Sequence, residues 1–184
     1  MSESTAAAAG QNTSLLIRGA EPADHEAIRR VVLGAYAQYA GLPAPDVFSR
    51  YLADQLDLET HASYGRLLVA GTPEGVRGFA AFYPDASVHS SGFASGWAGV
   101  RALAVHPGAG RHGVTRVLLA ACERLAAEAG APVLALRSAS FMTDGIASYE
   151  RLGYRRAPEF DGTTPVRSVA HLRYVAQMYL NLRR

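Results

Sequence analysis

The sequence predicts an α/β domain in which helices cover both faces of a mixed β-sheet. Short β-branched and apolar segments alternate along the chain with segments whose apolar residues recur at helical spacing. Glycine- and proline-rich turns separate most of these segments. The 184 residues are enough to bury one substantial core, so a single layered domain is expected.

The first half of the chain begins with a segment unlike the rest. Residues 1–13 are rich in Ser, Ala and Gly and lack the basic start and apolar core of a signal peptide. We expect them to form a disordered tail, and residues 14–184 to form the domain. The elements predicted next are a strand at Leu15–Arg18, a helix from His25 to about Tyr39 with Asp24 as its N-cap, a helix at Val47–Gln55, and strands at Arg66–Ala70 and Val76–Tyr83 joined by a turn.

The second half repeats the alternation with a longer helix. After a Ser/Gly-rich loop at 87–96, the apolar run V-R-A-L-A-V predicts a strand, and apolar residues at helical spacing after it predict the main helix, which Gly130 and Pro132 end. The remaining predicted elements are a strand at Pro132–Leu136, a helix at Asp144–Leu152 capped by Gly153, and strands at Tyr154–Phe160 and about Tyr174–Leu182.

The turn between the strand at Val100–Val105 and the main helix is rich in glycine. It reads G-A-G-R-H-G over Gly108–Gly113. A glycine-rich turn that leads into a helix directs several backbone N–H groups, and the positive end of the helix dipole, at one spot. This arrangement suits a phosphate group, and we therefore expect a phosphorylated cofactor.

Two familiar phosphate-binding motifs fit this turn less well. A P-loop requires a Lys, and all 18 basic residues of this chain are Arg. The dinucleotide motif G-x-G-x-x-G is matched by Gly108, Gly110 and Gly113, but the acidic residue that should follow the next strand is replaced by Arg137. Because Arg137 could hold the phosphate of NADP, an NADP-dependent oxidoreductase stays open as a distant alternative.

A third interpretation uses more of the chain. L-A-V-H-P-G-A-G-R-H-G-V-T-R-V-L-L at Leu103–Leu119, A-S-Y-E-R-L-G-Y at Ala147–Tyr154 and L-I-R-G-A-E-P-A-D-H-E-A-I at Leu16–Ile28 together resemble the Gcn5-related N-acetyltransferase (GNAT) superfamily in order and spacing. The resemblance implies a mostly antiparallel, twisted sheet of about six to seven strands, splayed between strands 4 and 5. The chain departs from the family pattern at two positions, where Gly110 replaces an Arg or Gln and Thr115 replaces a small residue.

The resemblance also implies a cofactor and the residues that contact it. Acetyl-CoA or another acyl-CoA would lie in the splay, with its pantetheine arm along Leu103, Ala104 and Val105. Its pyrophosphate would lie against the turn and the helix start, which comprise Gly110, Arg111, His112, Gly113, Val114, Thr115 and Arg116. No metal is expected, because the six His residues show no ligand spacing.

The implied reaction is direct attack of an amine on the thioester within a ternary complex. The Val105 N–H is the candidate donor to the oxyanion, and Tyr149 occupies the position of the family's acid, where a phenol can donate to the departing thiolate. The alternative for Tyr149 is a core anchor that packs with Ile146 and Leu152. The sequence identifies no general base.

The acceptor is expected to be a small-molecule amine or a peptide or protein amine, bound near the first helix. One hypothesis is an acidic, aromatic site for a cationic amine; a solvated helix face is the interpretation that charge runs favour. The residues concerned are Tyr36, Tyr39, Asp46, Tyr51, Asp54, Asp57 and Glu59. A rival to the enzyme is a catalytically silent acyl-CoA-binding sensor or interaction module on the same scaffold.

Composition bounds the other partners. The net charge of +2 comes from scattered Arg residues, which argues against a dedicated nucleic-acid site, and no apolar run is long enough to span a membrane. The single Cys122 excludes an internal disulfide and is expected to be a small core residue. We therefore expect a soluble cytoplasmic protein, with a homodimer through the closing strands suggested only by analogy.

Overall fold

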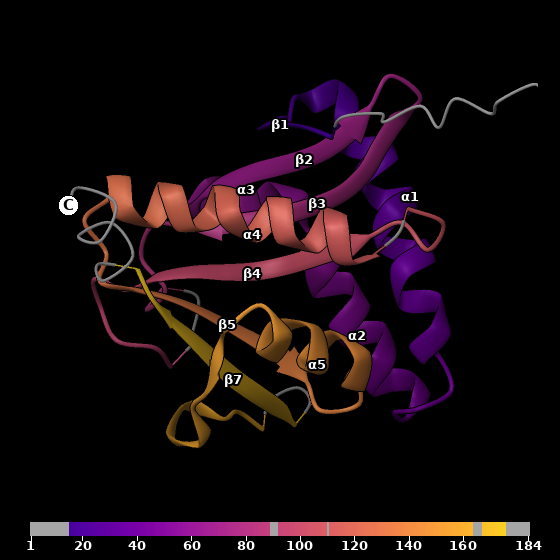
Figure 1. The fold of residues 1–184 in the computed structure, drawn as a ribbon. Coiled ribbons are helices and arrows are strands. Elements are labelled where there is room, and N and C mark those ends of the chain that lie inside the picture. The colour runs from indigo at the N-terminus through magenta and orange to yellow at the C-terminus, as the bar shows by residue number, and fades with distance from the viewer. Residues whose placement is uncertain (1–14, 89–91, 110, 164–166, 176–184) are drawn as a thin grey trace, which may run out of the picture.

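The computed structural model describes residues 15–88, 92–109, 111–163 and 167–175, with the side chains of Arg111 and His112 left out. These residues form a seven-stranded sheet with the order β1-β2-β3-β4-β5-β7-β6 (Figure 1). The strands are β1 Leu16–Gly19, β2 Arg66–Thr72, β3 Gly75–Tyr83, β4 Ala98–Val105, β5 Val133–Ala139, β6 Arg155–Arg156 and β7 Ser168–Tyr174. The predicted tail at 1–13 lies outside the described residues.

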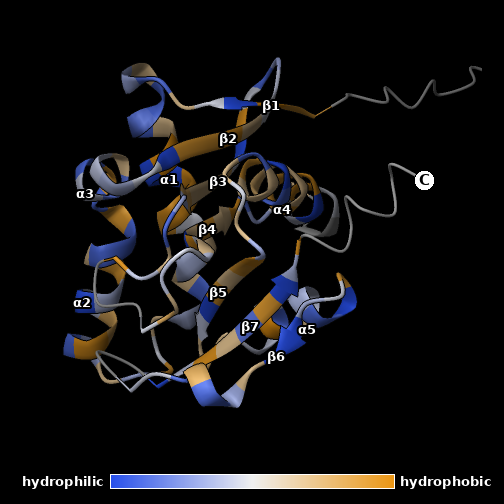
Figure 2. Cartoon of the chain, turned by 90° about the vertical axis from the view of Figure 1, so that its left-hand side faces the viewer, coloured by the Kyte–Doolittle hydropathy of each residue, from blue (hydrophilic) through white to orange (hydrophobic). Residues whose placement is uncertain are grey.

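Helices cover both faces of this sheet, as the alternation of elements predicts. Figure 2 shows α1, α2 and α3 on one side and α4 and α5 on the other. The helices are α1 His25–Tyr36, α2 Pro45–Leu56, α3 Leu58–Tyr64, α4 Arg111–Glu128 and α5 Thr143–Arg151.

The sheet is opened along one side of β4. Strands β4 and β5 are the parallel pair, and their register covers only Ala98–Val100 against Leu134–Leu136. Every other strand pair is antiparallel. Beyond these paired residues, β4 continues to Val105 and β5 to Ala139 with no pairing between them, so the mixed, splayed sheet expected from the family resemblance is confirmed (Figure 1).

A β-bulge lies at the point where the sheet opens. On β3, Ala81 pairs with Ala102 and Phe82 pairs with Val100, which leaves Arg101 of β4 without a partner. An extra residue of this kind bends its strand and re-aims the side chains that follow. The bulge and the end of β4–β5 pairing therefore coincide at Arg101.

Helix α4 packs closely on β3 because β3 has a glycine, Gly78, beneath the helix. A Cβ atom on Gly78 would lie 2.4 Å from Cγ1 of Val114 and 3.0 Å from Cδ1 of Leu118. Both of these α4 residues are buried in the core cluster on this face. Gly78 therefore sets how near the first turns of α4 lie to β3.

A buried polar cluster connects α4 to the strands beyond the opening. The Tyr154 hydroxyl donates a hydrogen bond of 2.9 Å to Oε1 of Glu123 on α4. Nε of Arg173 on β7 lies 3.3 Å from the same oxygen, and its guanidinium lies over the Tyr154 ring. Glu123, Tyr154 and Arg173 therefore connect α4 to the part of the sheet beyond the opening, in addition to the β4–β5 pairing.

Asp24 occupies the N-cap position of α1, as predicted, but its side chain makes no capping hydrogen bond to the helix. It also ends a short 3₁₀ turn at Pro22–Asp24. Its carboxylate instead accepts hydrogen bonds from the Arg18 guanidinium at 2.6 and 2.8 Å and from the Glu21 N–H at 2.8 Å. Asp24 thus ties β1 to the turn before α1. The helix itself ends at Tyr36, and a separate 3₁₀ turn covers Ala37–Tyr39.

Three other elements differ from the prediction. Helix α3 is not predicted from the sequence, because seven residues are too few to show helical periodicity. The strand predicted at Tyr154–Phe160 shrinks to two residues, since a 3₁₀ turn begins at Pro158, which lacks a backbone N–H. Strand β7 at Ser168–Tyr174 is not predicted, because polar His171 and Arg173 hide the alternation. Most of the range predicted for the closing strand, 176–182, lies outside the described residues, so that prediction is untested.

Candidate functional site

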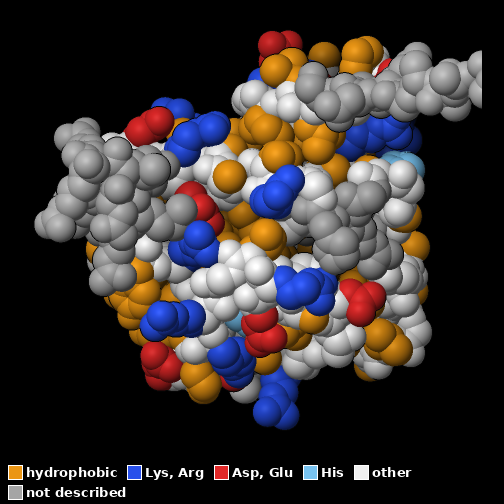
Figure 3. All heavy atoms as spheres, in the orientation of Figure 1, with side chains coloured by type: hydrophobic (Ala, Val, Ile, Leu, Met, Phe, Trp, Pro, Cys, Tyr) orange, Lys and Arg blue, Asp and Glu red, His pale blue; other side chains and the backbone are white. Residues whose placement is uncertain are grey.

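A cavity of about 310 Å³ lies where β4 separates from β5. Its walls come from the end of α1, the second half of β4, the start of α4, and α5. They include Tyr36, Tyr39, Leu103, Ala104, Val105, Thr115, Met142 and Tyr149. A second cavity of about 460 Å³ adjoins it between α4 and α5 and shares Thr115, Ser148 and Arg151 with it. Figure 3 shows this face of the molecule as a hollow with an apolar floor and Arg side chains around it.

The backbone of β4 presents alternate residues to this opening. The His106 N–H donates to the Arg77 carbonyl of β3 at 2.8 Å, and backbone direction alternates along a strand. The N–H and carbonyl of Val105 and Leu103 therefore point away from β3, toward the cavity. The Tyr36 hydroxyl, which lies 3.4 Å from the Leu103 carbonyl, is consistent with this direction. Ala104 directs its backbone at β3, so it can contribute only its side chain to the cavity.

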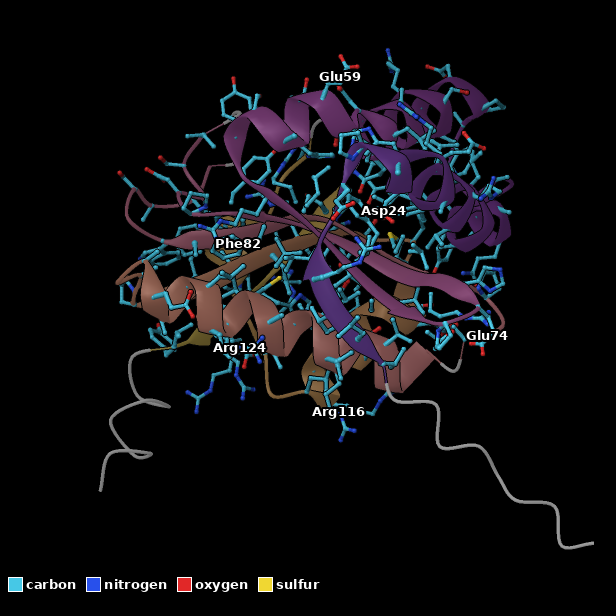
Figure 4. All side chains as sticks on the ribbon, turned by 90° about the horizontal axis from the view of Figure 1, so that it is seen from above. Asp24, Glu59, Glu74, Phe82, Arg116 and Arg124 are labelled. Atoms are coloured by element: carbon cyan, nitrogen blue, oxygen red, sulfur yellow. The ribbon has the colours of Figure 1, made fainter. Side chains whose placement is uncertain are left out.

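The start of α4 faces the second cavity. Arg111, His112 and Gly113 form its first turn, whose N–H groups have no acceptor within the helix. Thr115 and Arg116 lie one turn further on, where the N–H groups bond within the helix, so these two residues can offer only side chains. Thr115 is buried and lines both cavities. Arg116 is exposed and projects outward from α4 (Figure 4).

One predicted contact residue is placed differently, and another lies outside the described residues. Val114 is 1 % exposed and packs against the sheet above Gly78, so its side chain faces the core instead of the cavities. Gly110 lies outside the described residues, as do the side chains of Arg111 and His112. Of the predicted residues, the structure brings Leu103, Ala104, Val105, Thr115 and Tyr149 together around the 310 Å³ cavity, and Gly113 and Arg116 join Thr115 around the second.

Tyr149 lies on α5 at the inner wall of the cavity. Its side chain is 7 % exposed, and its ring lies near those of Tyr154 and His171, with centroids 6.3 and 6.1 Å away. Burial raises the pKa of the Tyr149 phenol to about 12, and the hydrogen bond with Ser138 opposes this shift. The phenol is therefore a protonated donor at neutral pH. Tyr149 packs in the core and also lines the cavity, so its two predicted roles are compatible.

An aromatic cluster closes the side of the cavity nearest α1 and α2. Four rings touch in a cycle, with centroid distances of 6.3 Å for Tyr36–Tyr39, 5.7 Å for Tyr39–Phe141, 5.9 Å for Phe141–Tyr51 and 5.8 Å for Tyr51–Tyr36. Burial raises the pKa of Tyr36 and Tyr51, so both phenols stay protonated. Of the aromatic residues predicted for the acceptor region, Tyr36 and Tyr39 line this cavity, and Tyr51 lines a smaller cavity of about 20 Å³ that adjoins it.

The acidic half of that region does not gather at the cavity. Asp46 is exposed and pairs with Arg50, and Asp57 caps α3 by accepting from the Thr60 N–H. Glu59 points away from the body of the molecule (Figure 4). Only Asp54 turns inward, where it lies 3.8 Å from Arg101.

The sequence interpretation missed Arg101 as a site residue and considered Arg137 only for NADP. Both line a third cavity of about 20 Å³ at the inner end of the opening, together with Tyr36, Leu103, Met142 and Tyr149. Arg101 reaches it from the bulge of β4, and Arg137 from β5. Nothing in the local sequence marks a bulge, because it depends on the register with β3.

The described part of the chain shows neither a metal-ligand cluster nor a membrane-spanning helix. There, no group of three or more His, Cys, Asp and Glu residues could hold a metal ion. Over the same residues, no helix combines the length and the apolar character that crossing a bilayer requires. Cys122 is fully buried in the core, and burial raises the pKa of its thiol to about 12.

A mixed sheet that splays apart beside the N-terminus of a helix is the arrangement of the GNAT fold. Residues 33–154 match the model of the Acetyltransferase (GNAT) family, and the chain belongs to this family. No sequence among the curated proteins matches it.

Solved structures support the fold. The chain is similar to the PaiA N-acetyltransferase from Thermoplasma acidophilum in complex with coenzyme A, with 15% identity, a TM-score of 0.67, and 88% of this chain and 99% of that chain covered. It is similar to YncA, a putative acetyltransferase from Salmonella typhimurium with acetyl-CoA, at 19% identity and a TM-score of 0.57, covering 88% and 94%. The ribosomal-protein-S18-alanine N-acetyltransferase from Escherichia coli matches at 20% identity and a TM-score of 0.55, covering 86% and 91%.

Proposed function

We propose that this protein transfers an acetyl group from acetyl-CoA to a primary amine by direct attack in a ternary complex. The observation that carries the proposal is the free edge of β4 beside the first turn of α4. A free strand edge can pair with the amides of a pantetheine arm, and a helix N-terminus suits a diphosphate. Similar structures were solved with coenzyme A and with acetyl-CoA, which fits the same ligand chemistry.

The cofactor would contact two parts of the site. Leu103 and Val105 direct both backbone groups at the cavity, so they are the candidates to hydrogen-bond the pantetheine arm. The N–H groups of Arg111, His112 and Gly113 are the candidates for the pyrophosphate. Thr115 lines both cavities, so its hydroxyl is the candidate to contact the link between the pantetheine arm and the diphosphate.

The chemical step then requires two donors. A neutral amine nitrogen attacks the thioester carbon, the C=O electrons move to the oxygen, and the Val105 N–H stabilises that oxyanion. Collapse of the intermediate breaks the C–S bond and releases the coenzyme A thiolate. The protonated Tyr149 phenol donates to this sulfur, while the nitrogen loses its extra proton to solvent or a base.

A ligand panel followed by a transfer assay tests this proposal. Acetyl-CoA and coenzyme A should raise the melting temperature of the protein, and NADP should not. A thiol-release assay over primary amines and peptide N-termini should then show turnover that depends on both substrates. Stabilisation by acetyl-CoA without transfer to any amine would instead favour the silent acyl-CoA-binding module, and stabilisation by NADP alone would refute the cofactor assignment.

A further inference from the structure

Two arginines meet at the inner end of the cleft. Arg101 stands at the bulge of β4, and Arg137 follows the last β5 residue that pairs with β4. Both line the 20 Å³ cavity, which shares Tyr36, Leu103 and Tyr149 with the 310 Å³ cavity. Two cationic side chains therefore reach the acceptor side of the opening, one from β4 and one from β5.

Neither guanidinium is fully satisfied. Among the described residues, Nε of Arg101 and Nε of Arg137 are buried and have no hydrogen-bond partner. Buried N–H groups of this kind are rare in proteins and indicate an absent partner such as a ligand or water. Each arginine therefore leaves its Nε–H donor unused in hydrogen bonds with the described residues.

The charges around the pair do not balance either. The carboxylate nearest to Arg101 is Asp54, whose Oδ2 lies 3.8 Å from Nη2, beyond hydrogen-bond distance, and accepts instead from Gln55 at 3.0 Å. Arg137 donates to the neutral carbonyl of Phe160. Burial first, and then the charge of Arg101, lower the pKa of Arg137. The charge of Asp161 opposes this shift, but Asp161 is itself paired with Arg156. Among the described residues, the three cations Arg101, Arg137 and Arg156 therefore share the two carboxylates of Asp54 and Asp161.

The rest of this end of the cleft is aromatic. Tyr36 and Tyr51 belong to the cycle of four rings, and Met142 lies against the Tyr51 hydroxyl at 3.5 Å. Burying apolar surface here favours a ligand with an apolar body. A ligand that also carries an anionic group would satisfy the free Nε donors at the same time.

We propose that Arg101 and Arg137 bind the carboxylate of the acceptor, so that the acceptor is an amino acid-like amine with an apolar body. The inference rests on the proposed function, because it assigns the second substrate of the same cleft. Guanidinium groups suit this role, since their planar donors match the two oxygens of a carboxylate. The 20 Å³ cavity has room for about one such oxygen before the side chains adjust.

Matched acceptors test the inference without any variant. Phenylalanine and phenylalaninamide share an amine and an aromatic body and differ in the carboxylate. With acetyl-CoA fixed near saturation, kcat/KM should be about tenfold or more higher for the acid than for the amide. Equal use of the two acceptors, or preference for the amide, would overturn the carboxylate assignment and leave the transferase proposal standing.

Single variants then assign the preference to these residues. Arg101→Gln and Arg137→Gln should each lower kcat/KM for phenylalanine about tenfold, with little change for phenylalaninamide or in the KM of acetyl-CoA. The matched control is Arg50→Gln, which removes an exposed guanidinium from α2 and should change none of these values. Variants that lower both acceptors equally would indicate a structural role and count against the inference. Arg101→Lys and Arg137→Lys, which keep the charge, serve if a Gln variant does not fold.

A binding measurement separates failure of the inference from failure of the proposed function. Calorimetry in the presence of coenzyme A compares N-acetylphenylalanine with its amide. If no amine is acetylated but the acid binds more tightly and Arg101→Gln abolishes the difference, the transferase proposal fails and the anion site stands. If amines are acetylated but acid and amide bind alike, the anion site fails and the transferase proposal stands.

Discussion

Replacement of Tyr149 by Phe tests the chemistry of the site, because it removes one hydroxyl and leaves the ring in place. The pKa of Tyr149 is raised to about 12, whereas a free thiol has a pKa near 8.5. Full proton transfer from the phenol to the departing thiolate would be uphill by about 5 kcal/mol on these values. We therefore expect Tyr149 to stabilise the thiolate by a hydrogen bond, and not to end the step deprotonated.

The size of the effect follows from that role. A hydrogen bond to a charged group is worth about 1.5–3 kcal/mol, so Tyr149→Phe should lower kcat by about 10- to 150-fold. The KM of acetyl-CoA should stay the same, because the backbone of β4 and the start of α4 are untouched. Since the phenol stays protonated up to its raised pKa, Tyr149 should cause no loss of rate below about pH 11.

Steady-state release of the coenzyme A thiol, followed between pH 7 and pH 9.5, provides the measurement. Tyr174→Phe is the control, since it removes a phenol that is 52% exposed at the end of β7. The reasoning fails if Tyr149→Phe keeps kcat within about twofold of the parent, which is too small for a charged hydrogen bond. It also fails if the parent loses activity with a pKa below 10 that the variant lacks.

Two further predictions concern the scaffold. Gly78→Ala should destabilise the fold by about 1–3 kcal/mol in urea unfolding, because its Cβ would meet Cγ1 of Val114 at 2.4 Å; Gly19→Ala on β1, with no atom within 4 Å of the added carbon, should not, and equal losses would refute the packing argument. The hydrogen bond from Arg18 is the chief cause that lowers the pKa of Asp24 to about 2, so the pair stabilises the fold fully above the unfolded carboxyl pKa near 3.9 and stops doing so as the pH falls toward 2. Because Arg18 is 44% exposed, Asp24→Asn should cost only about 1 kcal/mol at pH 7 and almost nothing at pH 2, and an equal cost at both pH values would contradict the ion pair.

Local patterns were enough to predict the layers of the fold. The β-branched run before His106, the glycines after it and the helical spacing beyond them correctly placed β4 and α4 and pointed to the N-terminus of α4. The family resemblance supplied the splay, which no local pattern indicates. Strand pairing is a property of two segments, and the end of β4–β5 register after Val100 cannot be read from either one.

The part of the candidate site that is made of backbone groups was easier to predict than the part that is made of side chains. The family resemblance implied Leu103 and Val105, and the glycine-rich turn before a helix pointed to Gly113; in the structure these residues line the two adjoining cavities. Arg101 was missed because its position depends on a bulge formed with β3. The pairing of Asp24 with Arg18 was missed as well, since an acidic residue before a helix is more often a cap.

The cluster of Glu123, Tyr154 and Arg173 bears on how the protein meets its ligands. These charged, hydrogen-bonded contacts span the opening, so they resist any change in the angle between the β1–β4 part and the β5–β7 part of the sheet. The gap beside β4 is then already formed in the empty protein, so an entering ligand spends little of its binding free energy on rearranging its host. Removing these contacts should therefore weaken ligand binding, even though none of the three residues lines the opening.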